Sequence, residues 1–120
     1  MEKIQNSKYD LEERTLQFAL ECRALVKKIS RTIGNIEDGK QLVRSSGSVS
    51  ANYIEANESL SKKDYYMRVK ICRKEAKESR LWLKVIGISG NQELENEREK
   101  LILEATELTH IFGSIVTKQK

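Results

Sequence analysis

Apolar residues recur at spacings of three and four along most of the chain, as they do on one face of an α-helix. The pattern falls into four segments and predicts helices over about residues 10–32, 38–58, 62–86 and 91–116. In the first two segments the predicted buried positions are Leu11, Thr15, Phe18, Cys22, Leu25, Ile29, Ile33, Leu42, Val49, Tyr53, Ala56 and Leu60. In the last two they are Met67, Ile71, Cys72, Ala76, Trp82, Leu83, Val85, Ile86, Leu94, Leu101, Ala105, Leu108, Phe112 and Ile115.

Turn and capping residues separate these segments. Asp10 and Ser61 each begin a capping-box pattern, with an acidic residue three positions later. Residues 34–39 (GNIEDG) predict the first turn, and residues 87–91 (GISGN) are expected to end the third helix with a glycine as its C-cap. The connections are short, so neighbouring helices should run antiparallel. The sequence therefore predicts an all-α protein, with residues 1–120 forming a single up-down-up-down four-helix bundle.

The second segment contains an unusual run of small residues, SSGSVSA, at positions 45–51. These residues are poor or middling helix formers, and in isolation the run would indicate a loop. Because the apolar pattern continues on both sides and the chain has no proline, we expect a helix instead. Small side chains would let a neighbouring helix pack closely there.

Composition restricts the class of protein further. No apolar run approaches the roughly 20 residues that span a bilayer. The N-terminal sequence MEKIQNSKYD lacks the apolar stretch of a signal peptide, so we expect a cytoplasmic protein with no membrane partner. Cys22 and Cys72 occupy apolar helix positions. Buried reduced thiols are the favoured interpretation, and a disulfide or redox pair is the alternative.

Six polar residues fall where the second and third helices should face each other. Glu75 and Glu78 lie on the apolar side of the third helix, where solvated charges are not expected. A polar stripe on the second helix could be a solvated face, or it could join the two acids in a partly buried network, because buried acids need cationic or hydrogen-bonding partners. The proposed network consists of Arg44, Ser48, Asn52, Glu55, Glu75 and Glu78.

The opposite side of the third helix is strongly basic. Residues 62–90 carry nine basic and three acidic residues, although the whole chain has a net charge of only +4. Such a face is often only a solvated surface, but it could also neutralise several phosphates of a nucleic acid, with Tyr66 stacking on an exposed base. The candidate nucleic-acid-binding residues are Lys62, Tyr66, Lys70, Arg73, Lys74, Lys77, Arg80 and Lys84.

Motifs for catalysis and metal binding are weak by comparison. Glu107 and His110 match one half of a di-iron Glu-x-x-His pair, but His110 is the single histidine of the chain. Glu75 and Glu78 could act as general acids if burial raised their pKa values, although no other residue indicates a substrate. We therefore predict no catalytic residue, no metal site and no cofactor.

The stretch Gln41–Glu55 (QLVRSSGSVSANYIE) resembles the signature of the bacterial four-helix-bundle family encoded in 23S ribosomal RNA intervening sequences. The segments SKKDYY and ICRKEAKESRLWL, within residues 61–83, resemble the third-helix signature of one branch of that family. Val43 departs from the pattern, because an arginine is common there, and Ala56–Asn57 stands where a glycine is common. The accessory protein of diversity-generating retroelements is similar to this family.

The resemblance implies a left-handed up-down bundle that assembles as a homopentamer and has no established enzymatic activity. It also implies a basic surface, through which retroelement relatives bind nucleic acid and a reverse transcriptase. We therefore expect a non-enzymatic, oligomeric nucleic-acid-binding or adaptor protein whose partners are itself, RNA or DNA, and a nucleic-acid-processing protein. The alternative is a structural homo-oligomer that associates through apolar residues off the helix seams, such as Leu16, Leu20, Leu81 and Leu103.

Overall fold

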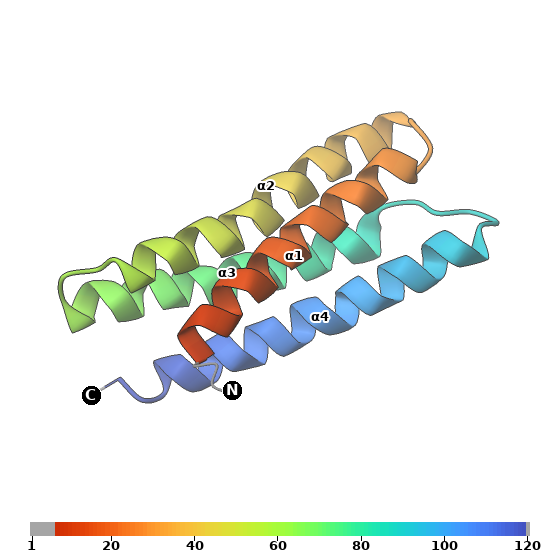
Figure 1. Ribbon diagram of the computed structural model, residues 1–120. Coiled ribbons are helices and arrows are strands. Elements are labelled where there is room, and N and C mark those ends of the chain that lie inside the picture. The colour runs from red at the N-terminus through yellow and green to blue at the C-terminus, as the bar shows by residue number, and fades with distance from the viewer. Residues whose placement is uncertain (1–6, 120) are drawn as a thin grey trace.

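Four α-helices make up the computed structural model, which describes residues 7–119, with side chains from Leu11 onward. They are α1 (Ser7–Lys28), α2 (Ile33–Asn57), α3 (Lys62–Val85) and α4 (Gln92–Val116). Successive helices run antiparallel (Figure 1), and the described residues contain no strand. The predicted all-α up-down four-helix bundle is confirmed. No helix among residues 7–119 is long and apolar enough to cross a membrane.

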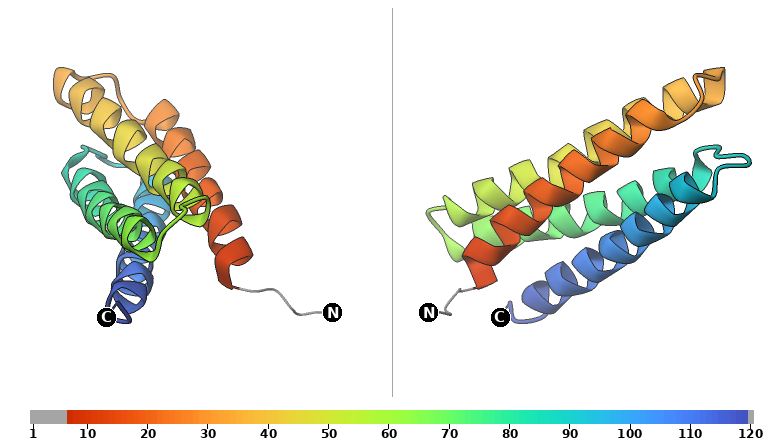
Figure 2. Two further views of the ribbon diagram at one scale, coloured as in Figure 1. Left: turned by 90° about the vertical axis from the view of Figure 1, so that its left-hand side faces the viewer. Right: turned by 45° about the vertical axis from the view of Figure 1, so that its right-hand side comes forward.

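The four helices are not packed with equal closeness. The α2–α3 and α3–α4 pairs make the most extensive contacts, α1 packs mainly on α2, and the α1–α4 contact is the smallest. The two views of Figure 2 show α1 and α2 side by side as one layer, and α3 and α4 as the other. As a result α3 lies beside α2 and α4 along its length, and only part of its surface remains available to solvent.

The core consists mostly of the positions that helical spacing identifies. Phe18 and Leu25 of α1, Val49 of α2 and Leu108 of α4 are almost wholly buried. The Tyr53 ring packs against that of Phe112, with centroids 5.8 Å apart and an interplanar angle of 48°. Burial of apolar surface of this kind stabilises a fold by about 25 cal/mol per Å². The predicted seams of α1 and α4 therefore lie within this core along most of their length.

Four predicted core positions are instead exposed. Ile33 is 85% exposed because it is the first residue of α2, and Leu60 is fully exposed in the α2–α3 turn. Met67 and Val85 are 51% and 47% exposed. Both lie at the edge between the apolar and basic sides of α3. The apolar face predicted from residue spacing was therefore too wide at this edge.

The first turn lies earlier than predicted. The chain turns at about residues 29–32, and the segment predicted as a turn is the first part of α2. Thr32 is the N-cap, because its side chain accepts a hydrogen bond from the backbone N–H of Asn35 at 3.0 Å. Gly39 lies inside α2, where a Cβ atom would sit 3.1 Å from a Val26 methyl group. The glycine thus permits a close α1–α2 approach and does not mark a turn.

The other helix ends differ from prediction in detail. Asp10 is not the N-cap of α1, since the helix is already formed at Ser7. Ser61 does cap α3, accepting from the backbone N–H of Asp64 at 3.1 Å. Ile86, not Gly87, is the C-cap of α3, and Gly90 takes the positive φ of 70° that the α3–α4 turn requires.

The run of small residues 45–51 is helical, as expected. Ser45, Ser46 and Ser50 are buried between neighbouring helices. The Ser45 hydroxyl lies 2.8 Å from that of Ser79 on α3. Ser79 also donates to the Glu75 backbone carbonyl at 2.9 Å, and Ser45 to that of Leu42 at 3.4 Å. Small polar side chains therefore allow the close α2–α3 packing that the sequence suggested.

Candidate nucleic-acid interface

The basic side of α3 forms the candidate interface, and the sequence-predicted residues lie along it from the first turn of the helix to the last. We call this set the α3 basic face. Its exposed members are Lys62, Lys70, Arg73, Lys74, Lys77 and Lys84, and its half-buried members are Tyr66 and Arg80.

Lysines in the middle and last turns of the α3 basic face make no direct polar contact within the described fold. Within residues 11–119, no ion pair or side-chain hydrogen bond involves Lys70, Lys74, Lys77 or Lys84. Cations on other helices are used differently. Arg14 of α1, for example, binds Glu104 and Glu107 of α4, and its Nε–Oε2 distance to Glu104 is 2.7 Å. The α3 lysines therefore keep their charge available for a ligand.

Two arginines at the α4 side of the face are held more firmly. Arg80 donates from Nη1 to the hydroxyl of Thr106 at 3.3 Å. The Arg73 side chain crosses α4 at Gly113, and its Cδ would lie 3.7 Å from a Cβ atom built there. A Cβ atom at position 113 would thus be in ordinary van der Waals contact with the Arg73 side chain. Side chains at the α4 side of the α3 basic face are thus positioned by contacts with α4. Side chains at the centre of the face have no such contact.

Apolar side chains interrupt the charged surface. Leu81 is 50% exposed and lies among the lysines on the helical wheel of α3. Met67 and Val85 are also exposed at the edge of the face. A surface that combines unpaired cations with exposed apolar groups can contact a protein as well as a phosphate backbone.

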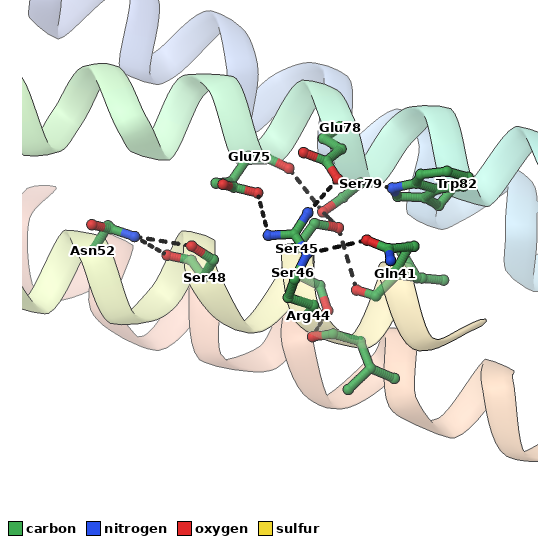
Figure 3. Close-up of polar contacts among 12 residues, drawn as sticks. Gln41, Arg44, Ser45, Ser46, Ser48, Asn52, Glu75, Glu78, Ser79 and Trp82 are labelled. Atoms are coloured by element: carbon green, nitrogen blue, oxygen red, sulfur yellow. Dashed lines mark hydrogen bonds and ion pairs between the residues drawn. The ribbon is translucent and has the colours of Figure 1, made fainter. Parts of the chain in front are cut away.

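Behind the α3 basic face, a polar cluster joins α2 to α3 (Figure 3). Arg44 of α2 reaches both predicted acids: its Nη1 lies 3.3 Å from Glu75 Oε1 and its Nη2 binds Glu78 Oε2. Glu75 is only 7% exposed. The Trp82 indole N–H donates to the same Glu78 oxygen at 3.0 Å. One guanidinium therefore provides the cationic partner that two carboxylates on an otherwise apolar side require.

The ionisation of Glu78 follows from these contacts. The hydrogen bond from Trp82 and the Arg44 guanidinium hold the pKa of Glu78 below its ordinary value, against a smaller opposing effect of burial. The two carboxylates in turn raise the pKa of Arg44, with Glu78 as the main cause. The charged forms of both Arg44 and Glu78 are thus favoured, as expected of a structural ion pair.

The rest of the predicted network is arranged differently. Asn52 does not reach Glu75 or Glu78. Its amide donates to the Ser48 carbonyl and hydroxyl, both at 3.0 Å, and its Oδ1 accepts from Arg68 Nη1 at 2.9 Å. The Glu55 side chain is exposed and makes no hydrogen bond or ion pair within residues 11–119. The stripe therefore divides into an Arg44 cluster and a separate Asn52–Arg68 contact.

One polar residue that joins the loops was missed from the sequence. Asn35 donates to the backbone carbonyls of Ser30 and Gly87 at 3.0 and 2.9 Å, and its Oδ1 accepts from the Gly87 N–H at 2.8 Å. It thereby ties the α1–α2 turn to the α3–α4 turn. Because Asn35 lies between two glycines, the sequence indicated a turn residue. No feature of the sequence identified Gly87 as its distant partner.

The acids of the Arg44 cluster lie away from the main recesses described on this surface. Arg44 lines one recess, but neither Glu75 nor Glu78 is in the wall of that recess or of four others. Within residues 7–119, no three His, Cys, Asp or Glu side chains are grouped so as to hold a metal ion. Cys22 and Cys72 are free and buried. Burial raises the pKa of each thiol to about 12.

Known proteins similar to the chain agree with this architecture. The family model described as 23S rRNA-intervening sequence protein matches residues 7–114. A crystal structure of a protein of unknown function from the S23 ribosomal protein family of Bacteroides thetaiotaomicron superposes with a TM-score of 0.73 and 27% sequence identity. That match covers 88% of this chain and 96% of the other. No curated protein sequence matches the chain.

Proposed function

This chain belongs to the family of 23S rRNA-intervening sequence proteins, and from that premise we propose that it is a non-enzymatic, oligomeric, cytoplasmic protein that binds nucleic acid through the α3 basic face. The observation that supports the proposal most is the state of the lysines. Lys70, Lys74 and Lys77 are exposed and have no ion-pair partner within residues 11–119. Their charged groups make no direct ion pair in the described fold, and exposed cations without such a partner favour an anionic ligand.

A nucleic-acid backbone fits such a surface. Lysines spaced along one helix can each approach a phosphate, and each contact releases condensed counterions. Binding of this kind depends steeply on salt and has little sequence preference, because phosphates carry no sequence information. The surface has no feature that favours RNA over DNA. In the adaptor form of the proposal, the same face also contacts a nucleic-acid-processing protein.

The test is a salt titration of binding to RNA and to DNA, measured by fluorescence anisotropy. We expect the logarithm of the binding constant to fall linearly with the logarithm of the salt concentration. In a variant with Lys70→Glu, Lys74→Glu and Lys77→Glu, the affinity should drop by at least about tenfold and the slope should become shallower by roughly 0.9 per lost phosphate contact.

A matched control separates the α3 basic face from net charge. Lys27, Arg31 and Lys100 are exposed and have no ion-pair partner within residues 11–119, so reversing them to Glu changes the total charge equally. This control should retain most of the affinity and the slope. Binding that is independent of salt, or an equal loss in both triple variants, would overturn the proposal.

The second candidate is a structural homo-oligomer with no nucleic-acid role. It is favoured by apolar side chains exposed on three helices: Leu16 and Leu20 at 45% and 50%, Leu81 at 50% and Leu103 at 63%. Such groups are commonly covered when copies associate. The pentamer implied by the family resemblance is the specific assembly proposed. Light scattering tests it, and a strict monomer at micromolar concentration would contradict both the oligomer and the oligomeric part of the first proposal.

A further inference from the structure

A recess at one end of the bundle joins the start of α3 to the end of α4. It is lined by Lys62, Lys63, Tyr66, Lys118 and Gln119 and has a volume of about 460 Å³, within the range of pockets that hold small ligands. We call it the end recess. The α2–α3 turn and the end of α4 lie at the same end of the molecule in Figure 1 and in the right-hand view of Figure 2. Residues more than fifty positions apart therefore form one wall.

The charged residues that line the end recess, among those the structure describes, are all positive. Three of the five lining residues are lysines and none is acidic. Lys62, Lys63 and Lys118 are exposed, and none has an ion-pair partner within residues 11–119. Lys118 lies just beyond the end of α4, so the recess extends the α3 basic face to the segment that follows a second helix. Three lysines lining one recess favour a ligand with more than one negative oxygen, such as a phosphate.

An aromatic ring lies among these cations. Tyr66 is half-buried, and its ring centroid is 5.2 Å from that of Tyr65 at an interplanar angle of 77°. Tyr65 packs against the hydrophobic core. The edge-to-face contact therefore restrains the Tyr66 ring before any ligand arrives. A restrained ring beside cations provides both parts of a nucleotide site, a stacking surface for a base and charge for its phosphates.

A neighbouring recess extends the site along the chain. It has a volume of about 500 Å³ and shares Lys62 and Tyr66 with the end recess, adding Leu60 and Asn57 among its lining residues. Leu60 is fully exposed. Tyr66 therefore lies between two recesses, and a strand can continue from one to the other past its ring. A base within a duplex is stacked on both faces and paired along one edge, so only an unpaired base can reach the ring.

We propose that the end recess binds an unpaired nucleotide of a nucleic-acid strand, with its base against Tyr66 and its phosphates among Lys62, Lys63 and Lys118. The inference rests on the proposed function and deepens it. The α3 basic face supplies general attraction to the backbone, and the end recess supplies a preference for single-stranded ends or flanks over blunt duplex.

The experiment measures the ratio of two affinities at one salt concentration. The probes are a blunt duplex and the same duplex with a single-stranded overhang, followed by anisotropy. Wild-type protein should bind the overhang probe about tenfold more tightly, as expected for one stacked base. Tyr66→Ala should bring the ratio to about one, and Tyr66→Phe should preserve it, because stacking needs the ring and not the hydroxyl. Tyr66→Phe keeps the ring that packs against Tyr65, whereas Tyr66→Ala removes it. Circular dichroism checks that both variants retain the helical fold.

Charge variants provide the second comparison. Lys118→Glu, in the end recess, should lower the ratio, whereas Lys77→Glu, on the α3 basic face, should weaken both probes and leave the ratio near that of wild type. Equal affinities of wild-type protein for the two probes, or a Tyr66→Ala ratio equal to that of Tyr66→Phe, would overturn the end-recess proposal alone. Failure to bind either probe would overturn the proposed function together with it.

Discussion

The Arg44 cluster gives the most direct test of how the α2–α3 interface is held. The variant Arg44→Met keeps an unbranched apolar stem and removes the guanidinium. It leaves Glu75, which is 7% exposed, without the cation at 3.3 Å. It also removes one of the two donors to Glu78, whose remaining partner is the Trp82 indole. The variant therefore converts a compensated buried acid into an uncompensated one.

The expected magnitude lies between two limits. Removing one partner of a fully buried ion pair costs about 3–5 kcal/mol, whereas a surface pair contributes about 0–1 kcal/mol. The Arg44 side chain is 48% exposed, and that of Glu75 is 9% exposed. Water can therefore replace part, but not all, of the lost interaction. We expect the free energy of unfolding to fall by about 2 kcal/mol, which corresponds to a decrease in Tm of about 8 °C for a domain of this size.

The assay is equilibrium urea unfolding followed by circular dichroism, with a double-mutant cycle. Glu75→Gln alone should cost little, because it removes the charge that needs a partner. Arg44→Met combined with Glu75→Gln should be less destabilising than the sum of the single changes, by about 1–2 kcal/mol. Lys40→Met is the matched control. Lys40 lies on the same helix and its 3.6 Å pair with Glu37 is exposed, so its loss should cost under about 0.5 kcal/mol.

The same variant has a defined pH dependence. The Trp82 hydrogen bond and Arg44 depress the pKa of Glu78 in the folded state. A depressed carboxyl pKa contributes stability that is present above the unfolded pKa and is lost as pH falls through the folded pKa. The stability gap between wild type and Arg44→Met should therefore be largest near neutral pH and shrink in acid.

Three results would refute this reasoning. The first is an Arg44→Met variant within about 0.5 kcal/mol of wild type, the range of an ordinary surface substitution. The second is strict additivity in the cycle with Glu75→Gln. The third is a stability gap that widens as pH falls, which would mean that the carboxylates are not the groups that Arg44 stabilises.

Two further predictions concern the loops and the thiols. Asn35→Ala removes all three side-chain hydrogen bonds to Ser30 and Gly87 and should lower the free energy of unfolding by about 2–3 kcal/mol, with faster amide exchange at Gly87. A variant as stable as wild type would show that the two turns do not depend on this residue. Cys22 and Cys72, whose pKa values burial raises to about 12, should react with a thiol reagent only at the rate of unfolding. Rapid labelling of the native protein at neutral pH would contradict their burial.

Most of the fold could be predicted because the bundle follows one periodicity. Phe18, Leu25, Leu108 and Phe112 are buried because positions three and four apart share a helix face. The pairing of Arg44 with Glu75 and Glu78 could also be anticipated, since acids on an apolar side need a cation. The family resemblance pointed to the same helices.

The remaining features depend on contacts between distant residues. Gly39 suggested a turn, but its role is to accommodate Val26 of α1, a contact that no local pattern contains. Asn52 was expected beside the two acids, but Arg68 lies within reach and takes its Oδ1. The end recess includes Lys118, whose position just after α4 gave no indication that the chain would bring it beside Tyr66.

The bundle is weakest along the contact between α1 and α4. This contact is the smallest of the four, and ion pairs bridge it at two places, Arg14 with Glu104 and Glu107 and Lys28 with Glu97. Ion pairs at a surface are screened by salt, whereas the buried apolar core between α2 and α3 and the partly buried pair of Arg44 with Glu75 are screened much less. The first cooperative opening of the native protein should therefore release α1 from α4 while α2, α3 and α4 stay together. High salt should lower the free energy of that opening without a comparable effect on global unfolding.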